Sequence, residues 1–180
     1  MSFNGKVLLG VTGSISAYKA AVIARLLVKQ GCEVQIVLSK GGAQFITPLT
    51  LSTVSKKPVL TEFYVEKTGE WNNHVALAEW ADLILIAPAS ANTIAKLANG
   101  FCDELLHAIY LSAKTKVVMA PAMDHDMWNH PSVKRNVKQL KEDGIAIIPP
   151  EDGELASGII GSGRLAEPEN ILDFINKLSF

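Results

Sequence analysis

Two short polar turns in this sequence carry residue types that bind phosphate groups. The first reads GVTGSISAYK and brings Gly10, Gly13, Ser14 and Ser16 to the start of an alanine-rich segment. Glycines let the backbone approach an anion closely, while N–H groups at a helix start and serine hydroxyls supply hydrogen-bond donors. The spacing is neither that of a P-loop nor that of the GxGxxG motif. Taken alone, the segment is equally compatible with an ordinary serine cap on a helix.

The second polar turn follows the apolar segment LILIA. It brings Ser90, Asn92 and Thr93 within one turn of a second expected helix start, beside the small residue Ala91. Ser39, at the end of another apolar segment, is placed to complete the rim of the same site. Two polar helix starts at the carboxyl ends of parallel strands are typical of a mononucleotide crevice. We expect one turn to take a phosphate and the other a ring system, and we favour ligand binding over coincidence.

Histidines and cysteines offer a third kind of chemistry. His74 lies at an expected helix start, where an imidazole can be partly exposed and titrate near neutral pH, although a capping role is the commoner use of such a residue. His107, His125 and His130 are interpreted as helix-surface or loop residues. Cys32 and Cys102 lack the spacing of metal ligands, so we expect no metal site and interpret both as small core residues.

Alternating apolar strands and amphipathic helices would position these groups. Continuous apolar runs at 7–11, 34–39, 83–87, 116–120 and 145–149 predict strands covered on both faces. Helical periodicity predicts helices over 17–28, from Pro48, over 91–98, 103–113, 131–143 and 168–178. The alternation predicts an α/β fold, a flavodoxin-like or Rossmann-like doubly wound parallel sheet in three layers, with residues 1–180 as one domain.

Two segments are irregular. Residues 56–73 mix aromatic and charged side chains and are compatible with an extra edge strand or a loop. Residues 149–168 contain four glycines without clear periodicity and are interpreted as a functional loop.

Composition limits the partners. Of the 180 residues 48% are apolar, and 17 Lys and Arg balance 18 Asp and Glu without charge runs, so the sequence offers no basic surface for nucleic acid or an anionic membrane. The opening MSFNGKVLLG reaches a strand pattern at once, without a signal-peptide pattern, and no apolar run is long enough to cross a bilayer. We therefore expect a cytoplasmic protein.

Three motifs together resemble the flavin-dependent cysteine decarboxylase family, and within it the phosphopantothenoylcysteine decarboxylases. They are HVALAEWAD, beginning at His74, then APASANTIAKLANGFCDELL and PAMDHDMW, and the likeness spans nearly the whole chain. The resemblance implies a flavodoxin-like fold, bound FMN, homotrimers that can assemble into dodecamers, and an active site between neighbouring subunits. It also implies that the flavin is held by Gly13, Ser14, Ile15, Ser39, Ser90, Ala91, Asn92, Thr93 and Ala122.

The same resemblance assigns His74 as the catalytic base and places Asp124 and Met127 in the substrate-recognition motif. Better-known members carry Asn where this chain has Asp124. An amide can donate a hydrogen bond to a substrate carboxylate, whereas an ionised Asp repels it. Three interpretations stay open: a protonated Asp124 that donates, an Asp124 turned onto another group, or a different substrate.

The segment GELASGIIGSGRLAEP resembles the family's flexible loop over the active site, in which a Cys supplies a proton in the last reduction. Ser157 stands at that position here, and a hydroxyl is a poorer acid than a thiol of pKa ~8.5. Arg164 is a candidate clamp for a phosphate or carboxylate of the substrate, although a loop Arg is more often only solvated.

The resemblance predicts FMN-dependent decarboxylation of 4'-phosphopantothenoylcysteine to 4'-phosphopantetheine in coenzyme A biosynthesis. In the implied mechanism the cysteine moiety is oxidised to a thioaldehyde, loses carbon dioxide and is then reduced to the saturated thiol. Ser157 favours an alternative, a peptidyl-cysteine decarboxylase of peptide natural-product synthesis that stops at the enethiol. A non-catalytic FMN-binding subunit is a third hypothesis, and the retained His74 argues against it.

Overall fold

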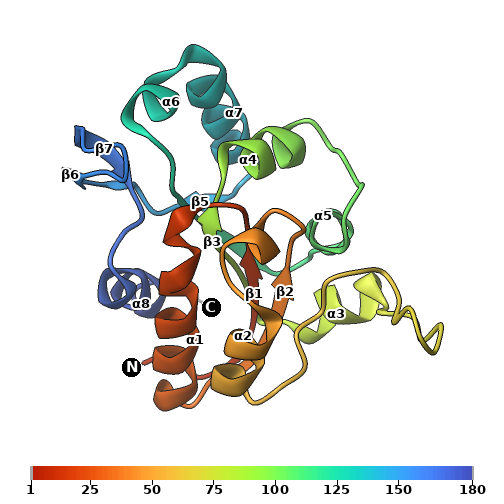
Figure 1. Cartoon of the computed structure of the whole chain (residues 1–180). Helices are drawn as coiled ribbons and strands as arrows, with labels where there is room; N and C mark the ends of the chain where they lie inside the picture. Colours follow the sequence, from red (N-terminus) through yellow and green to blue (C-terminus); the bar gives the residue numbers. More distant parts are fainter. Residues whose placement is uncertain (1, 180) are drawn as a thin grey trace.

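The computed structural model describes residues 2–179, in which a parallel sheet lies between two helical layers (Figure 1). The sheet has the order β2-β1-β3-β4-β5, and every pairing in it is parallel. This is the flavodoxin-like order of a doubly wound sheet. The predicted fold class is therefore confirmed. The strands are β1 (Lys6–Val11), β2 (Glu33–Leu38), β3 (Leu83–Ala89), β4 (Lys116–Pro121) and β5 (Ala146–Ile147).

The helices follow the strands as the periodicity predicts. One layer, packed on Val7 and Leu9 of β1, contains α1 (Tyr18–Gln30), α2 (Pro48–Ser55) and α8 (Pro168–Asn176). The other layer packs on Leu8, because successive side chains of a strand point to opposite faces. It contains α3 (His74–Trp80), α4 (Ala91–Ala98), α5 (Leu105–Leu111) and α7 (Pro131–Glu142). Shorter helices are η1 (Ile15–Ala17), η2 (Gly42–Gln44) and α6 (His125–Asn129).

The second irregular segment differs from the prediction of a loop. It forms an antiparallel hairpin of β6 (Glu151–Glu154) and β7 (Ile160–Arg164), which projects from the main sheet beside α6 (Figure 1). The strands are rich in Gly, Asp and Glu, which are depleted in sheets, so their sequence carries no strand signal. Strand β5 is also shorter than predicted, because Pro149 and Pro150 follow it and cannot donate to the ladder.

Residues 56–73 contain a fragment of an edge strand. Leu60 forms a parallel bridge with Val37, and its backbone bonds both Leu38 and Ile36. The remainder is a protrusion beside α3, closed by an antiparallel bridge between Tyr64 and Trp71 (Figure 1).

Two single-residue predictions were wrong. His107 is buried at 1% exposure, not on the surface, because its Nδ1 pairs with Asp103 at 2.9 Å. Cys102 is exposed and is not a core residue, whereas Cys32 is buried as predicted, and burial raises the pKa of its thiol to about 11. Within residues 2–179, no helix combines the length and apolar character needed to cross a membrane.

Candidate functional site

The turn after β1 packs against the turn after β2, and glycine makes this possible. A Cβ atom on Gly13 would lie 3.1 Å from the carbonyl carbon of Gly41, tighter than ordinary contact. Ser14 then caps η1, its Oγ accepting the backbone N–H of Ser16 at 3.2 Å. The two turns therefore lie backbone to backbone and form one wall of a cavity at the carboxyl end of the sheet.

The turn after β3 forms the facing wall. Ser90 caps α4, with its Oγ accepting the backbone N–H of Thr93 at 3.2 Å and lying 3.1 Å from the Thr93 hydroxyl. Thr12, which is fully buried, connects this wall to the first: its hydroxyl donates to the carbonyl of Pro88 at 2.7 Å and accepts the N–H of Ser90 at 2.9 Å. The polar groups of both turns are thus held at one end of the sheet.

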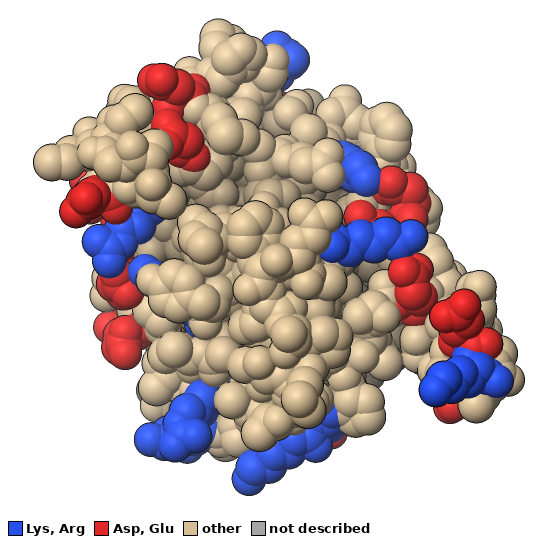
Figure 2. All heavy atoms as spheres, in the orientation of Figure 1, with Lys and Arg blue, Asp and Glu red and all other residues tan. Residues whose placement is uncertain are grey.

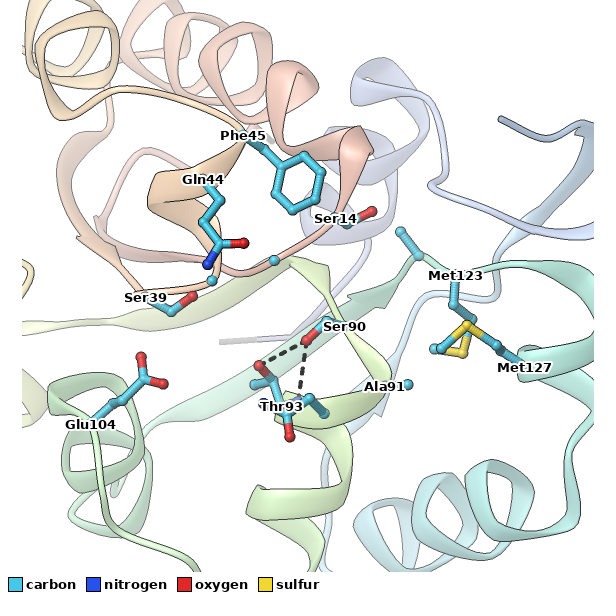
Figure 3. Close-up of a pocket in the computed structure, with 14 residues that line it drawn as sticks. Ser14, Ser39, Gln44, Phe45, Ser90, Ala91, Thr93, Glu104, Met123 and Met127 are labelled. Carbon is cyan, nitrogen blue, oxygen red and sulfur yellow. Dashed lines mark hydrogen bonds between the residues drawn. The ribbon is translucent and has the colours of Figure 1, made fainter. Parts of the chain in front are cut away.

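The cavity between these walls has a volume of about 370 Å³ (Figure 3). Most of the residues that sequence reasoning proposed for the flavin line it together: Gly13, Ser14, Ser39, Ser90, Ala91, Asn92, Thr93 and Ala122, with Met127 from the proposed substrate set. Sequence reasoning missed other residues of its wall, namely Gly41, Gln44, Phe45, Glu104 and Met123. The position of 41–45 just after β2 was a usable signal, because ligands of such sheets bind at the carboxyl ends of the strands.

A second cavity, of about 490 Å³, adjoins the first, since Ser14 and Met123 line both. It holds the remaining flavin candidate, Ile15, and two of the proposed substrate residues, Asp124 and Arg164. Charges of both signs line this second cavity, with Lys19 and Arg164 on one hand and Asp124 and Glu154 on the other.

Asp124 is already engaged by its own chain. It caps α6, and its Oδ2 accepts the hydroxyl of Ser157 at 2.5 Å. This hydrogen bond is the main cause that lowers the pKa of Asp124 below its usual range. In this chain Asp124 is thus turned onto another group, and this contact favours its ionised form.

Arg164 is fixed by an ion-pair cluster. Its guanidinium donates to Oε1 of Glu167 at 2.5 Å, and the same oxygen lies 3.0 Å from Nζ of Lys19. Lys19 is buried and also donates to the carbonyl of Leu165 at 3.3 Å. The hydrogen bond from Lys19 is the largest influence lowering the pKa of Glu167. Arg164 thus stands at the cavity edge as a held cation, not as a freely solvated one.

Hairpin β6–β7 docks on the segment between β4 and α6. The backbone N–H of Met123 donates to the carbonyl of Gly163 at 3.0 Å, and the N–H of Ser162 donates to Nδ1 of His125 at 3.1 Å. Gly163 has a φ of +139°, and a Cβ there would lie 2.3 Å from the carbonyl oxygen of Met123. Only glycine meets both conditions, so this position fixes where the hairpin lies.

We expect Gly163→Ala to weaken hairpin docking by about 1–3 kcal/mol, because it combines a strained backbone with a clash against backbone. Hydrogen exchange at the Met123 amide should accelerate accordingly. Gly158→Ala is the matched control, since Gly158 also has a positive φ, of +82°, but open space around its Cβ position. Equal effects of the two substitutions would contradict the docking role of Gly163.

His74 lies apart from both cavities. It is the first residue of α3, after the Asn73 cap, and its ring makes edge contacts with Trp71 and Phe63 at centroid distances of 6.0 and 6.3 Å. Its Nδ1 is buried and has no hydrogen-bond partner among the described residues. Figure 1 shows α3 at the opposite side of the molecule from α6 and the hairpin. Within one chain, the structure does not bring His74 together with Asp124 and Ser157.

Comparison with known proteins places this arrangement in a family. Among curated proteins, the coenzyme A biosynthesis bifunctional protein CoaBC of Bacillus subtilis is 43% identical over 174 residues, 97% of this chain and 43% of that protein. A cysteine/cysteine sulfinic acid decarboxylase from an unknown prokaryotic organism is 57% identical over 127 residues, 71% of this chain and 35% of that protein. The chain thus spans less than half the length of these two relatives.

Two further similarities extend over whole chains. A probable phosphopantothenoylcysteine decarboxylase of Streptococcus mutans is 42% identical over 174 residues, 96% of this chain and 97% of the relative. A solved structure of a mutant PPC decarboxylase, complexed with pantothenoylaminoethenethiol, superposes with a TM-score of 0.84 at 35% identity, covering 96% of this chain and 97% of the other. The profile of the Flavoprotein family matches residues 1–179. With its flavodoxin-like sheet and this full-length match, the chain belongs to the Flavoprotein family.

Proposed function

We propose that residues 1–180 form one FMN-binding domain that decarboxylates 4'-phosphopantothenoylcysteine to 4'-phosphopantetheine in coenzyme A biosynthesis, as a carboxy-lyase. The observation that best supports this function is the pair of adjoining cavities. Small and hydroxyl residues line the first cavity, and Arg164, which is paired with Glu167, lines the second. The names of the Bacillus and Streptococcus relatives support the same pathway.

The first cavity fits FMN in size and chemistry. Its volume of about 370 Å³ is within the usual range of ligand sites, and the turns that Gly13 and Gly41 allow to pack closely form its wall. The hydroxyls of Ser14 and Ser90 and the N-terminus of α4 supply donors, so that one turn would take the phosphate and the other would lie beside the ring system. Bound FMN would supply a redox centre that accepts electrons from the cysteine moiety and returns them.

The surrounding residues would hold the substrate beside that cofactor. Met127 offers an apolar wall, and Arg164 offers a charged fork suited to a carboxylate. Asp124 would lie beside the carboxylate region of the substrate as an ionised group that cannot donate to it, and it also holds the hairpin through Ser157. Ser157, or water beside it, would deliver the proton of the last reduction, as a weaker acid than a thiol.

We further propose a cytoplasmic homo-oligomer, a trimer or a dodecamer built from trimers, without nucleic acid or membrane partners. His74 lines neither cavity of its own chain. In the proposed assembly, His74 of one subunit would therefore act as the base at the cavities of a neighbouring subunit. Figure 2 shows a broad uncharged area in the middle of one face, with the charged side chains toward its margin. Exposed apolar residues around α1 and α2 suit such an interface: Ile15, Tyr18, Val22, Phe45 and Leu49.

The function is tested by incubating purified protein with phosphopantothenoylcysteine and identifying the products by mass spectrometry. We expect a yellow protein that releases FMN and forms the saturated thiol. An accumulating enethiol would favour the peptidyl-cysteine decarboxylase chemistry, with Ser157 unable to complete the reduction. A protein that binds FMN and leaves every cysteine substrate untouched would be the non-catalytic subunit, and failure to take up FMN would reject the proposal.

A second candidate function is decarboxylation of free L-cysteine or cysteine sulfinate. The specific observation is that the second cavity offers charges of both signs, because Asp124 and Glu154 line it together with Arg164. A free amino acid carries an ammonium and a carboxylate, whereas an N-acylated cysteine carries only the carboxylate. The name of the 57% identical relative supports this candidate. Comparing L-cysteine with N-acetyl-L-cysteine as substrates separates the two functions.

A further inference from the structure

One charged group of the first cavity has no part in the function described so far. Glu104 immediately precedes α5, and its side chain is only 16% exposed. Figure 3 shows its carboxyl group turned toward the cavity, on the side opposite Met123 and Met127. A carboxylate inside a site for a phosphate-bearing ligand requires a physical reason, because like charges repel.

The protein engages only part of this carboxylate. Its Oε2 accepts the backbone N–H of Lys40 at 3.1 Å. Its Oε1 lies 4.0 Å from Nζ of Lys96, whose nearer partner is Asp103 at 2.5 Å. An ionised carboxyl group can accept about four hydrogen bonds. Glu104 therefore keeps acceptor capacity for a ligand.

The neighbouring residues hold Glu104 in this position. Asp103 pairs on one side with Lys96 and on the other with the buried ring of His107, at 2.9 Å. Both contacts tie the segment before α5 to α4 and to the core. The carboxylate is thus presented to the cavity by a segment that these contacts hold in place, which lowers the ordering cost of binding.

We propose that Glu104 is a flavin-binding residue, which accepts a hydrogen bond from a neutral O–H or N–H donor of the cofactor and directs the phosphate away from its own carboxylate, to the Ser14 and Ser90 turns. The inference rests on the proposed binding of FMN. Ribityl hydroxyls and the ring imide are the neutral donors that a flavin offers. Repulsion by Glu104 leaves the phosphate to the Ser14 and Ser90 turns, where helix N–H groups attract anions.

The test compares FMN with riboflavin, which has the same ring and ribityl chain but no phosphate. Affinities of apoprotein for both are measured by quenching of flavin fluorescence, for the parent, Glu104→Ala and Glu104→Gln. We expect Glu104→Ala to weaken both flavins by the same factor, about ten- to a hundred-fold, the effect of losing a hydrogen bond to a charged group. Glu104→Gln should lose less, because its amide oxygen still accepts.

Glu62→Ala is the matched control, since Glu62 pairs with Lys40 at 3.6 Å but does not line the cavity. Unchanged affinities in both Glu104 variants would overturn the inference. A Glu104 variant that binds FMN more tightly, with no change in its affinity for riboflavin, would also overturn the inference, because it would show that the Glu104 carboxylate faces the phosphate. The near-isosteric Glu104→Gln decides the question if the alanine variant does not fold. A parent that binds neither flavin would reject the proposed cofactor itself, a distinct result.

Discussion

Replacing His74 with asparagine will lower the rate of carbon dioxide release by about a hundred- to ten-thousand-fold, the usual contribution of a general base. FMN should remain bound at the parental affinity, because His74 lines neither cavity. Asparagine keeps a polar group of similar size next to Trp71 and Phe63 but cannot exchange a proton near neutral pH. Single-turnover measurement of carbon dioxide, with flavin absorbance read in parallel, separates the two effects.

His130→Asn is a suitable control, since the Nδ1 of His130 only caps α7, and asparagine is an equally good cap. A parental rate in His74→Asn would show that the ring is structural. Mixed oligomers add a sharper test. His74→Asn chains combined with chains in which Gly13→Val disrupts the cavity wall against Gly41 should regain part of the activity, because one chain supplies the cavity and the other the base. No recovery in demonstrably mixed oligomers would argue against a site shared between subunits.

Changing Asp124 to asparagine should raise kcat/KM for phosphopantothenoylcysteine and lower it for L-cysteine, each by about ten- to a hundred-fold. The amide can donate to a substrate carboxylate, while loss of the negative charge removes a partner for the ammonium of a free amino acid. Asp124→Ala serves as the control, because it removes the charge without adding a donor. A parallel change for both substrates would indicate that Asp124 acts only through the hairpin.

The pH dependence follows from the same contact. The hydrogen bond from Ser157 lowers the pKa of Asp124. The stabilisation that this contact gives is therefore fully present above the ordinary pKa of an Asp, and it is lost as the pH falls through the lowered pKa of Asp124. Between about pH 5 and 7 the charge of Asp124 does not change. Mild acidification should therefore not raise activity, as it would if a protonated Asp124 had to donate to the substrate. A rise of parental activity over that interval that disappears in Asp124→Asn would contradict this assignment.

Most of the fold could be predicted because its signals are local. The apolar run of β3 and the helical period of α4 need only a few consecutive residues to be recognised, and Ala91–Ala98 is the helix that the sequence predicts. The hairpin could not be predicted, because it depends on backbone pairing, as of Gly153 with Gly161, and on the docking of Gly163 against Met123, not on a side-chain pattern. The burial of His107 likewise depends on Asp103, four residues earlier, because Asp103 gives the ring nitrogen Nδ1 a hydrogen-bond partner.

The residues of the candidate site also differ in whether a local sequence signal indicates them. The turns around Ser14 and Ser90 were predicted because each polar group lies at the start of its own helix. Glu104 was missed, because it reaches the cavity from a segment whose residue types show no ligand-binding pattern, and Phe45 was missed because only its position just after β2 indicated the site. The position of His74 depends on contacts beyond a single chain under the proposed assembly, so neither the sequence nor one chain's geometry brings it to the cavity.

The buried Thr12 hydroxyl has a consequence for how ligand specificity can change. By bonding both Pro88 and Ser90 it connects the end of β1 with the end of β3, so the two walls of the cavity cannot shift independently. Ligand binding then costs little ordering of the backbone. Redesign for another ligand would have to proceed through side chains that project from the walls, such as Gln44 and Phe45, while the backbone frame stays as it is.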